Sequence, residues 1–81
     1  MFLRGQVVLS EAGRDSGYLM AVTDYDDAYV YVCDGKERRL MKPKRKNPKH
    51  IKITHWILNE TQMHSDKSLR KALAELETNK E

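Results

Sequence analysis

Residues 28–41 read Ala-Tyr-Val-Tyr-Val-Cys-Asp-Gly-Lys-Glu-Arg-Arg-Leu-Met, and this stretch predicts a β-hairpin. From residue 28 to 33, Ala and Val alternate with Tyr and Cys, so the two sets of side chains face opposite sides of a strand. Asp34-Gly35 favours a type I′ turn, which needs positive φ at both central residues. The turn would send the chain back along a further strand over residues 36–41.

Similar short apolar runs lie on either side of this hairpin. Residues 5–10 and 18–23 predict two strands joined by a glycine-containing turn, and residues 50–55 predict another strand that can continue to residue 58. Residues 24–27 form a polar turn. Five short strands with tight turns favour a small, strongly bent antiparallel barrel, because a flat sheet would leave two free edges and one wet apolar face.

The hydrophobic period changes near the C-terminus, where residues 65–78 predict an α-helix. Leu69, Ala72, Leu73 and Leu76 follow the i, i+3, i+4, i+7 pattern, and Ser65 or Asp66 can cap the helix. The leucine stripe must lie against the barrel or against a partner, and we favour the barrel. We therefore expect one domain, made of a barrel over residues 1–58, a connector over 59–64 and a helix over 65–78.

Positive charge is concentrated in residues 36–50. This segment carries eight Lys and Arg side chains against one acid, Glu37, and so has a formal charge of +7, whereas the remainder of the chain carries −4. Pro43 and Pro48 exclude a helix or a central strand here and indicate an extended loop with its side chains splayed into solvent. Such a block attracts polyanions, and nucleic acid is the commonest of them. A solvated basic loop and a nuclear localisation patch are the alternatives.

Two segments resemble the KOW motif of ribosomal proteins and of transcription elongation factors of the NusG type. The first is Gly5-Gln6-Val7-Val8-Leu9-Ser10 with Ala12-Gly13-Arg14-Asp15-Ser16-Gly17, and the second is Asp34-Gly35-Lys36 followed by the basic run to Lys49-His50. The second segment is similar to the KOW proteins of the archaeal and eukaryotic large ribosomal subunit. The resemblance covers residues 5–51 and implies an SH3-like barrel whose 13–17 loop and basic segment contact RNA. The chain departs from the ribosomal members after the barrel, because it lacks their long basic extensions.

The RNA-binding residues expected from these patterns lie in two groups. The loop group is Gly13, Arg14, Asp15 and Gly17, and the basic group is Lys36, Arg38, Arg39, Lys42, Lys44, Arg45, Lys46, Lys49 and His50. Arginine offers a planar fork of donors that suits phosphate or a guanine edge, and lysine contributes salt-dependent phosphate attraction. The aromatic side chains are candidates either for stacking on unpaired bases or for packing within the fold: Tyr18, Tyr25, Tyr29, Tyr31 and Trp56.

Catalytic and metal-dependent functions find little support in the sequence. His50, His55 and His64 lack nearby cysteine ligands, and Cys33 has no evident activating partner. We expect no catalytic residue, no cofactor, no metal and no small-molecule substrate. A single cysteine and the absence of a secretory leader or a long apolar run favour a cytoplasmic protein without a membrane partner.

These observations predict a non-catalytic RNA-binding protein with a role in translation or on the ribosome. The RNA partner would be ribosomal or another structured RNA, and its binding would be mainly electrostatic. The alternative is a protein-interaction module that docks on ribosomal proteins or on polymerase through the leucine stripe of the helix.

Overall fold

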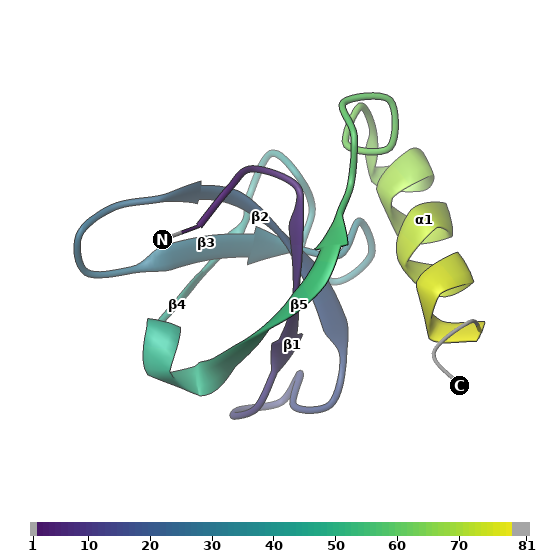
Figure 1. The fold of residues 1–81 in the computed structure, drawn as a ribbon. Helices are drawn as coiled ribbons and strands as arrows, with labels where there is room; N and C mark the ends of the chain where they lie inside the picture. The colour runs from purple at the N-terminus through teal and green to yellow at the C-terminus, as the bar shows by residue number, and fades with distance from the viewer. Residues whose placement is uncertain (1, 79–81) are drawn as a thin grey trace.

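The computed structural model describes residues 2–78, which form one antiparallel sheet and one C-terminal α-helix (Figure 1). In chain order the elements are β1 (Gln6–Ser10), β2 (Leu19–Tyr25), β3 (Val30–Cys33), β4 (Lys44–Lys46), the 3₁₀ helix η1 (Pro48–His50), β5 (Ile51–Ile57) and α1 (Asp66–Thr78). The five strands are arranged in the order β4-β3-β2-β1-β5, and every neighbouring pair is antiparallel. The predicted mainly β fold with five antiparallel strands and a C-terminal helix is therefore confirmed.

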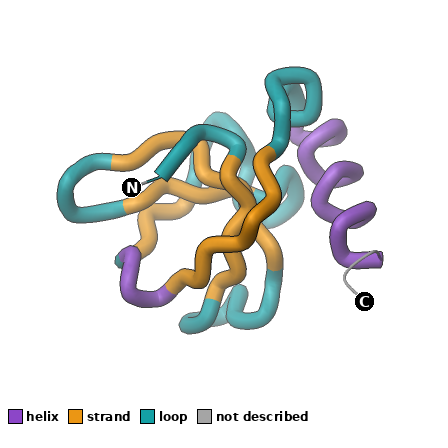
Figure 2. The backbone as a smooth tube through the Cα atoms, in the orientation of Figure 1, coloured by secondary structure: helices purple, strands orange, loops and turns teal. Residues whose placement is uncertain are grey.

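The sheet bends strongly without closing into a barrel. Its edges are β4 and β5, and within residues 2–78 no hydrogen-bonded ladder joins them. The single turn of η1 connects the two edges, so they approach each other at one end of the sheet (Figures 1 and 2). Asn47 caps this turn, because its side chain accepts a hydrogen bond of 2.9 Å from the backbone N–H of Lys49. With only three residues, β4 offers few backbone groups for a second ladder.

Alternation along the strands divides the core between the two faces of the sheet. One cluster of buried side chains contains Val8, Met20, Val22, Val30, Val32 and Ile51 and fills the inside of the bend. The other contains Val7, Leu19, Ala21, Cys33, Leu58, Met63 and three residues of α1, which are Leu69, Ala72 and Leu73. The helix thus covers one face of the sheet, as Figure 2 shows from the side. The alternation predicted for residues 28–33 is observed, since Val30 and Val32 lie in one cluster and Cys33 in the other.

The predicted type I′ turn and the strand over residues 36–41 are both wrong. Gly35 has φ of 77°, but within the described residues no side-chain-bearing residue has positive φ, so Asp34 does not take the conformation that a type I′ turn requires. The Asp34 carboxylate instead accepts hydrogen bonds of 2.9 Å from the backbone N–H groups of Lys36 and Arg38. A short acidic side chain competes in this way for the N–H groups that a strand would use. The segment therefore forms a compact loop.

The fourth strand lies later in the chain, in the run that was predicted to be a loop. Pro43 and Pro48 lie outside β4 at its two ends, so neither removes a hydrogen bond from the ladder between β3 and β4. Because β4 is an edge strand, flanking prolines are tolerated there. The prolines exclude a central strand, as predicted, but they allow a short edge strand.

Helix α1 begins with a reciprocal cap. The backbone N–H of Ser68 donates to Ser65 Oγ at 3.1 Å, and the backbone N–H of Ser65 donates to Ser68 Oγ at 3.1 Å. The first turns also hold the loop after β3, since Asp66 Oδ1 accepts the N–H of Leu40 at 2.7 Å and Arg70 donates to the Gly35 carbonyl at 3.2 Å. Within residues 2–78 no helix has the length and apolar character needed to cross a membrane.

Candidate nucleic-acid interface

The loop between β1 and β2 is tied to the edge strand β4 through one carboxylate. Asp15 Oδ1 accepts the Ser10 hydroxyl at 2.9 Å and lies 2.9 Å from Lys46 Nζ, while Asp15 Oδ2 lies 3.4 Å from Lys44 Nζ. Lys46 Nζ also donates to the Ala12 carbonyl oxygen at 2.6 Å. We call these four side chains, Ser10, Asp15, Lys44 and Lys46, the Asp15 cluster. It fixes the position of the 11–17 loop relative to β4.

The charge of Asp15 is strongly stabilised in this cluster. Burial by itself would raise the pKa of Asp15, but the hydrogen bonds from Lys46 and Ser10 and the ammonium charges of Lys46 and Lys44 outweigh it. Together they lower the pKa from 3.8 to about 2. Asp15 is therefore ionised at neutral pH and neutralises part of the charge of the two lysines.

The direction of the two lysines follows from the strand register. Lys46 pairs with Val30 and Lys44 with Val32, and paired residues of antiparallel strands project on the same face. Both lysines therefore point inward, toward the side where the two valines are buried. The Lys46 side chain is only 5% exposed and that of Lys44 is 26% exposed. The expectation that this run splays its side chains into solvent is wrong for these two residues, because they serve as counterions of Asp15.

Next to the Asp15 cluster, an open recess of about 510 Å³ brings together the two segments that the sequence singled out. One side is formed by the 11–17 loop and the residue before β2, and the other by the loop after β3. The lining residues are Arg14, Asp15, Tyr18, Asp34, Lys36, Glu37 and Arg38. We call it the loop recess. Arg14 and Lys36 are exposed and Arg38 is half-buried, so all three cations reach the surface.

The loop recess is lined by three acids and three bases, so its formal charges balance, and the contacts of each acid decide which charges an approaching anion meets. The Asp15 carboxylate already faces two ammonium groups, and the Asp34 carboxylate is engaged by two backbone N–H groups. Glu37 is exposed, as Arg14 and Lys36 are, so solvent screens these three charges alike. Within residues 2–78, Arg14, Lys36 and Arg38 form no ion pair, so they can meet an anion.

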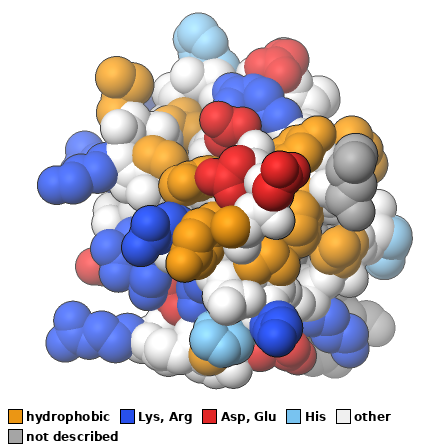
Figure 3. Space-filling model, turned by 90° about the vertical axis from the view of Figure 1, so that its left-hand side faces the viewer, with side chains coloured by type: hydrophobic (Ala, Val, Ile, Leu, Met, Phe, Trp, Pro, Cys, Tyr) orange, Lys and Arg blue, Asp and Glu red, His pale blue; other side chains and the backbone are white. Residues whose placement is uncertain are grey.

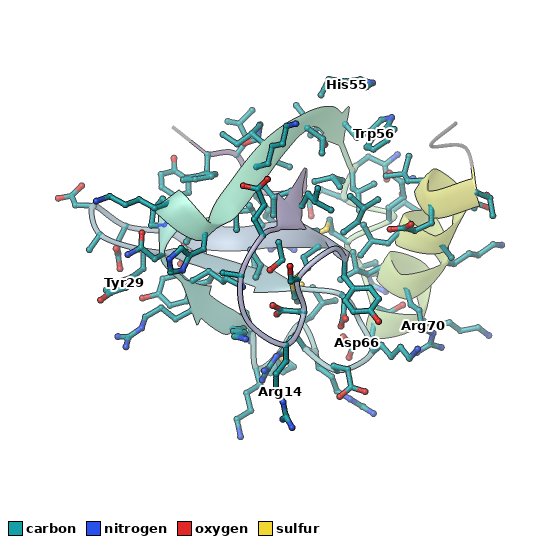
Figure 4. All side chains as sticks on the ribbon, turned by 90° about the horizontal axis from the view of Figure 1, so that it is seen from below. Arg14, Tyr29, His55, Trp56, Asp66 and Arg70 are labelled. Atoms are coloured by element: carbon teal, nitrogen blue, oxygen red, sulfur yellow. The ribbon has the colours of Figure 1, made fainter. Side chains whose placement is uncertain are left out.

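The conformation of the 13–17 loop requires its two glycines. Gly13 has φ of 85° and Gly17 has φ of 90°, a region that residues with a Cβ adopt only at a cost. A Cβ at Gly17 would meet nothing within 4 Å, so backbone conformation and not crowding explains this glycine. Between the glycines, Arg14 reaches away from the sheet, as seen at the lower edge of Figure 4. The loop therefore presents Arg14 on a tightly turned backbone.

The other basic residues of the 36–50 segment lie outside the loop recess, so this segment does not present all its charges on one surface. Arg39 and Lys42 are exposed in the loop before β4, whereas Lys49 and His50 are exposed on η1. Arg45 projects from the opposite face of β4 and stacks over the Tyr29 ring at 4.4 Å. Figure 4 shows Tyr29 well apart from Arg14, and on the face drawn in Figure 3 Lys and Arg side chains lie at the left, at the top and at the lower right, with carboxylates among them.

Asp34 and Tyr18, which the sequence suggested only as a turn residue and as one of five aromatic candidates, have definite places in the site. Asp34 organises the loop after β3, and Tyr18, immediately before β2, lines the loop recess. A second recess of about 390 Å³ continues along α1 and adds Arg70 to the same region. Only the position of Tyr18 directly after Gly17 hints at its exposure.

Comparisons with known proteins do not assign the chain to a family. No protein-family model matches it, and no curated protein gives a significant match. Within residues 2–78, no three His, Cys, Asp or Glu side chains are placed to hold a metal ion together. The site is therefore defined by its geometry alone. It is an open recess that bears cations, and it lies on a small, bent antiparallel β protein beside a loop held in place by the Asp15 cluster.

Proposed function

We propose that this chain is a non-catalytic RNA-binding protein of the KOW type that acts in the cytoplasm, in translation or on the ribosome. Its partner is ribosomal RNA or another structured RNA. The observation that carries the proposal is the loop recess, where the glycine-turned loop of Arg14 meets Lys36 and Arg38. The resemblance to the KOW motif over residues 5–51 implies RNA contact by the same two segments. The bent five-stranded sheet is compatible with an open SH3-like architecture.

The mechanism rests on phosphate contacts. Arg14 can form paired hydrogen bonds to one phosphate, and Lys36 and Arg38 place two more charges on the same side of the protein. Each phosphate contact releases counterions, so three contacts predict a slope of log K against log salt of about −2 to −3. Binding is therefore moderate in strength and sensitive to salt.

The Asp15 cluster removes two of the cations that the sequence suggested from the proposed RNA interface. Lys46 is buried and Lys44 is paired, so neutralising them would disturb the fold instead of removing an RNA contact. The two lysines hold the 11–17 loop in one conformation, and a loop held in this way loses less entropy when RNA binds. We assign Lys44, Lys46 and Asp15 to support of the loop, and Arg14, Lys36 and Arg38 to contact with RNA.

A charge-matched pair of triple variants tests the proposal. The first variant is Arg14→Gln, Lys36→Gln, Arg38→Gln. The control removes the same charge from exposed positions on β5 and α1 with Lys52→Gln, Lys67→Gln, Lys71→Gln. Fluorescence anisotropy with a labelled ribosomal RNA stem-loop, titrated between about 50 and 200 mM salt, gives the affinity and the slope.

We expect the first variant to bind about tenfold to a hundredfold more weakly and its salt slope to flatten by about 2 to 3, while the control changes little. Equal losses in both variants would show that net charge alone drives binding. A wild-type chain that does not bind the RNA at all would refute the proposal.

Docking on another protein is the competing function, and the surface first considered for it is not accessible. Leu69 and Leu73 of α1 are buried against the sheet, so a partner could reach them only if the helix moved away. Affinity capture without nuclease separates the two functions. Recovery of RNA with the tagged chain supports our proposal, whereas recovery of protein without RNA would favour docking.

A further inference from the structure

Tyr18 is an exposed aromatic side chain that lines the loop recess. It lies between Gly17 and the first residue of β2, and it is 62% exposed to solvent. An exposed aromatic ring beside cations offers a face on which a base can stack while its phosphates meet the positive charges.

The other aromatic side chains are engaged within the protein. Tyr25 lies against Phe2 with ring centroids 6.3 Å apart, and the Tyr29 ring lies beneath Arg45. The Tyr31 hydroxyl donates to Asp26 at 3.1 Å, and Trp56 packs with His55 and against the core. Among the described residues, Tyr18 takes part in no ring contact and no cation–π contact. Its ring faces are therefore available to a ligand.

The backbone beneath this ring is fixed. The N–H of Tyr18 donates to the Asp15 carbonyl at 3.1 Å, and the Tyr18 carbonyl accepts the N–H of Ser10 at 3.0 Å. Asp15 is itself held by the Asp15 cluster. A ring on a fixed backbone pays little conformational entropy on binding, which is the property of a stacking platform.

The ring also stands between two recesses. Tyr18, Asp34 and Lys36 line both the loop recess of about 510 Å³ and the second recess of about 390 Å³ along α1. Each volume falls in the range of about 300–1,000 Å³ that is usual for ligand sites. Cations flank the ring on both sides, with Arg14 in the first recess and Arg70 in the second.

We infer that Tyr18 is a stacking platform for an unpaired nucleobase, with the neighbouring phosphates held by the cations of the two recesses. The inference rests on the proposed RNA binding and specifies the kind of RNA bound, which is one that presents a single-stranded or flipped-out nucleotide to Tyr18. Duplex RNA does not expose a base face to the ring, whereas an unpaired base does. Stacking of one base on an aromatic side chain changes affinity about 5- to 150-fold.

Three variants and two probes test this inference. Tyr18→Leu removes the aromatic face but keeps an apolar side chain, Tyr18→Phe keeps the ring, and Tyr25→Leu is a control that removes a different exposed tyrosine. The probes are a labelled single-stranded RNA of mixed sequence and the duplex formed with its complement. A 2-aminopurine base in the single strand reports stacking through quenching of its fluorescence.

We expect the wild type to bind the single strand more tightly than the duplex at equal salt and to quench 2-aminopurine. Tyr18→Leu should lose about 5- to 150-fold in affinity for the single strand and lose the quenching, with duplex affinity and salt slope unchanged. Tyr18→Phe and Tyr25→Leu should behave like the wild type.

Two results overturn different statements. If Tyr18→Leu binds the single strand as well as the wild type does, or if the wild type prefers the duplex, the stacking inference is wrong while RNA binding stands. If the wild type binds neither probe and no ribosomal RNA stem-loop, the proposed function itself fails.

Discussion

Replacing Asp15 with asparagine removes one negative charge from the Asp15 cluster and leaves the shape of the side chain nearly unchanged. The carboxylate is 16% exposed and lies 2.9 Å from the ammonium of Lys46, which is itself 5% exposed. In Asp15→Asn this ammonium keeps the Ala12 carbonyl oxygen as a partner but loses its countercharge. A charge left buried without its counterion is destabilising.

The size of the effect follows from the pKa of Asp15. Burial would raise this pKa, yet the contacts with Lys46, Ser10 and Lys44 lower it from 3.8 to about 2, a difference worth about 2.4 kcal/mol. Solvent screens the more open contact with Lys44, so we expect a loss of about 1–2 kcal/mol in the free energy of unfolding. For a domain of this length that corresponds to a fall in Tm of about 4–16 °C.

The same contacts predict how stability depends on pH. Because the pKa of Asp15 is lower in the folded protein than in the unfolded chain, the unfolded chain takes up its proton first on acidification. The stabilisation is complete above about pH 5 and is lost as the pH falls through 3.8 towards about 2. The difference in stability between wild type and Asp15→Asn should therefore shrink over this interval.

Urea denaturation followed by circular dichroism, repeated between about pH 7 and pH 2, measures this difference. Asp27→Asn is the matched control, because Asp27 is exposed in the loop between β2 and β3, and it should leave the profile unchanged. Equal stability of wild type and Asp15→Asn at pH 7, or a difference that stays constant down to pH 2, would refute the reasoning.

Three further predictions concern the fold. Gly35→Ala should lower the free energy of unfolding by about 3 kcal/mol in urea denaturation, because Gly35 has φ of 77° and a Cβ there would also collide with the Asp66 carbonyl oxygen. A Cβ at Gly17 would meet open space, so Gly17→Ala should lower the free energy of unfolding by only about 1–2 kcal/mol. Equal costs would contradict the role of the collision. Ser65→Ala should cost about 1 kcal/mol and lower Tm in thermal scans, since Ser65 Oγ caps α1. Cys33 should resist iodoacetamide at pH 8 until the protein unfolds, because burial raises its thiol pKa to about 12; rapid alkylation of the folded protein would count against its burial.

The elements that the sequence predicted well are those that depend on local pattern. The strands at 5–10, 18–23 and 28–33 and the strand from residue 50 onward follow apolar alternation, and α1 follows a clear helical period with a serine cap. Their bounds differ from the prediction by a few residues, as at β2, which continues to Tyr25. Such patterns depend on near neighbours along the chain, so they can be read without knowledge of the fold.

The errors lie where hydrogen bonds that the hydrophobic pattern does not encode decide the outcome, whether they come from a near side chain or from a distant segment. The Asp34-Gly35 dipeptide suggests a hairpin, but the loop is shaped by the Asp34 carboxylate and by contacts of Gly35 and Leu40 with α1. In the same way, proline spacing suggested a loop at residues 44–46, whereas pairing with β3 makes a strand there.

The sequence by itself determined a mainly β domain with a C-terminal helix, a glycine-turned loop around Arg14 and a surplus of positive charge after residue 35. Only the tertiary structure decided which charges face solvent, because a buried ammonium is stable only beside a carboxylate. For the buried Lys46 that carboxylate is Asp15, which lies far away in the chain on the loop between β1 and β2. The bend of the sheet brings the two segments together, and with them it selects Arg14, Lys36 and Arg38 as the cations that line the loop recess.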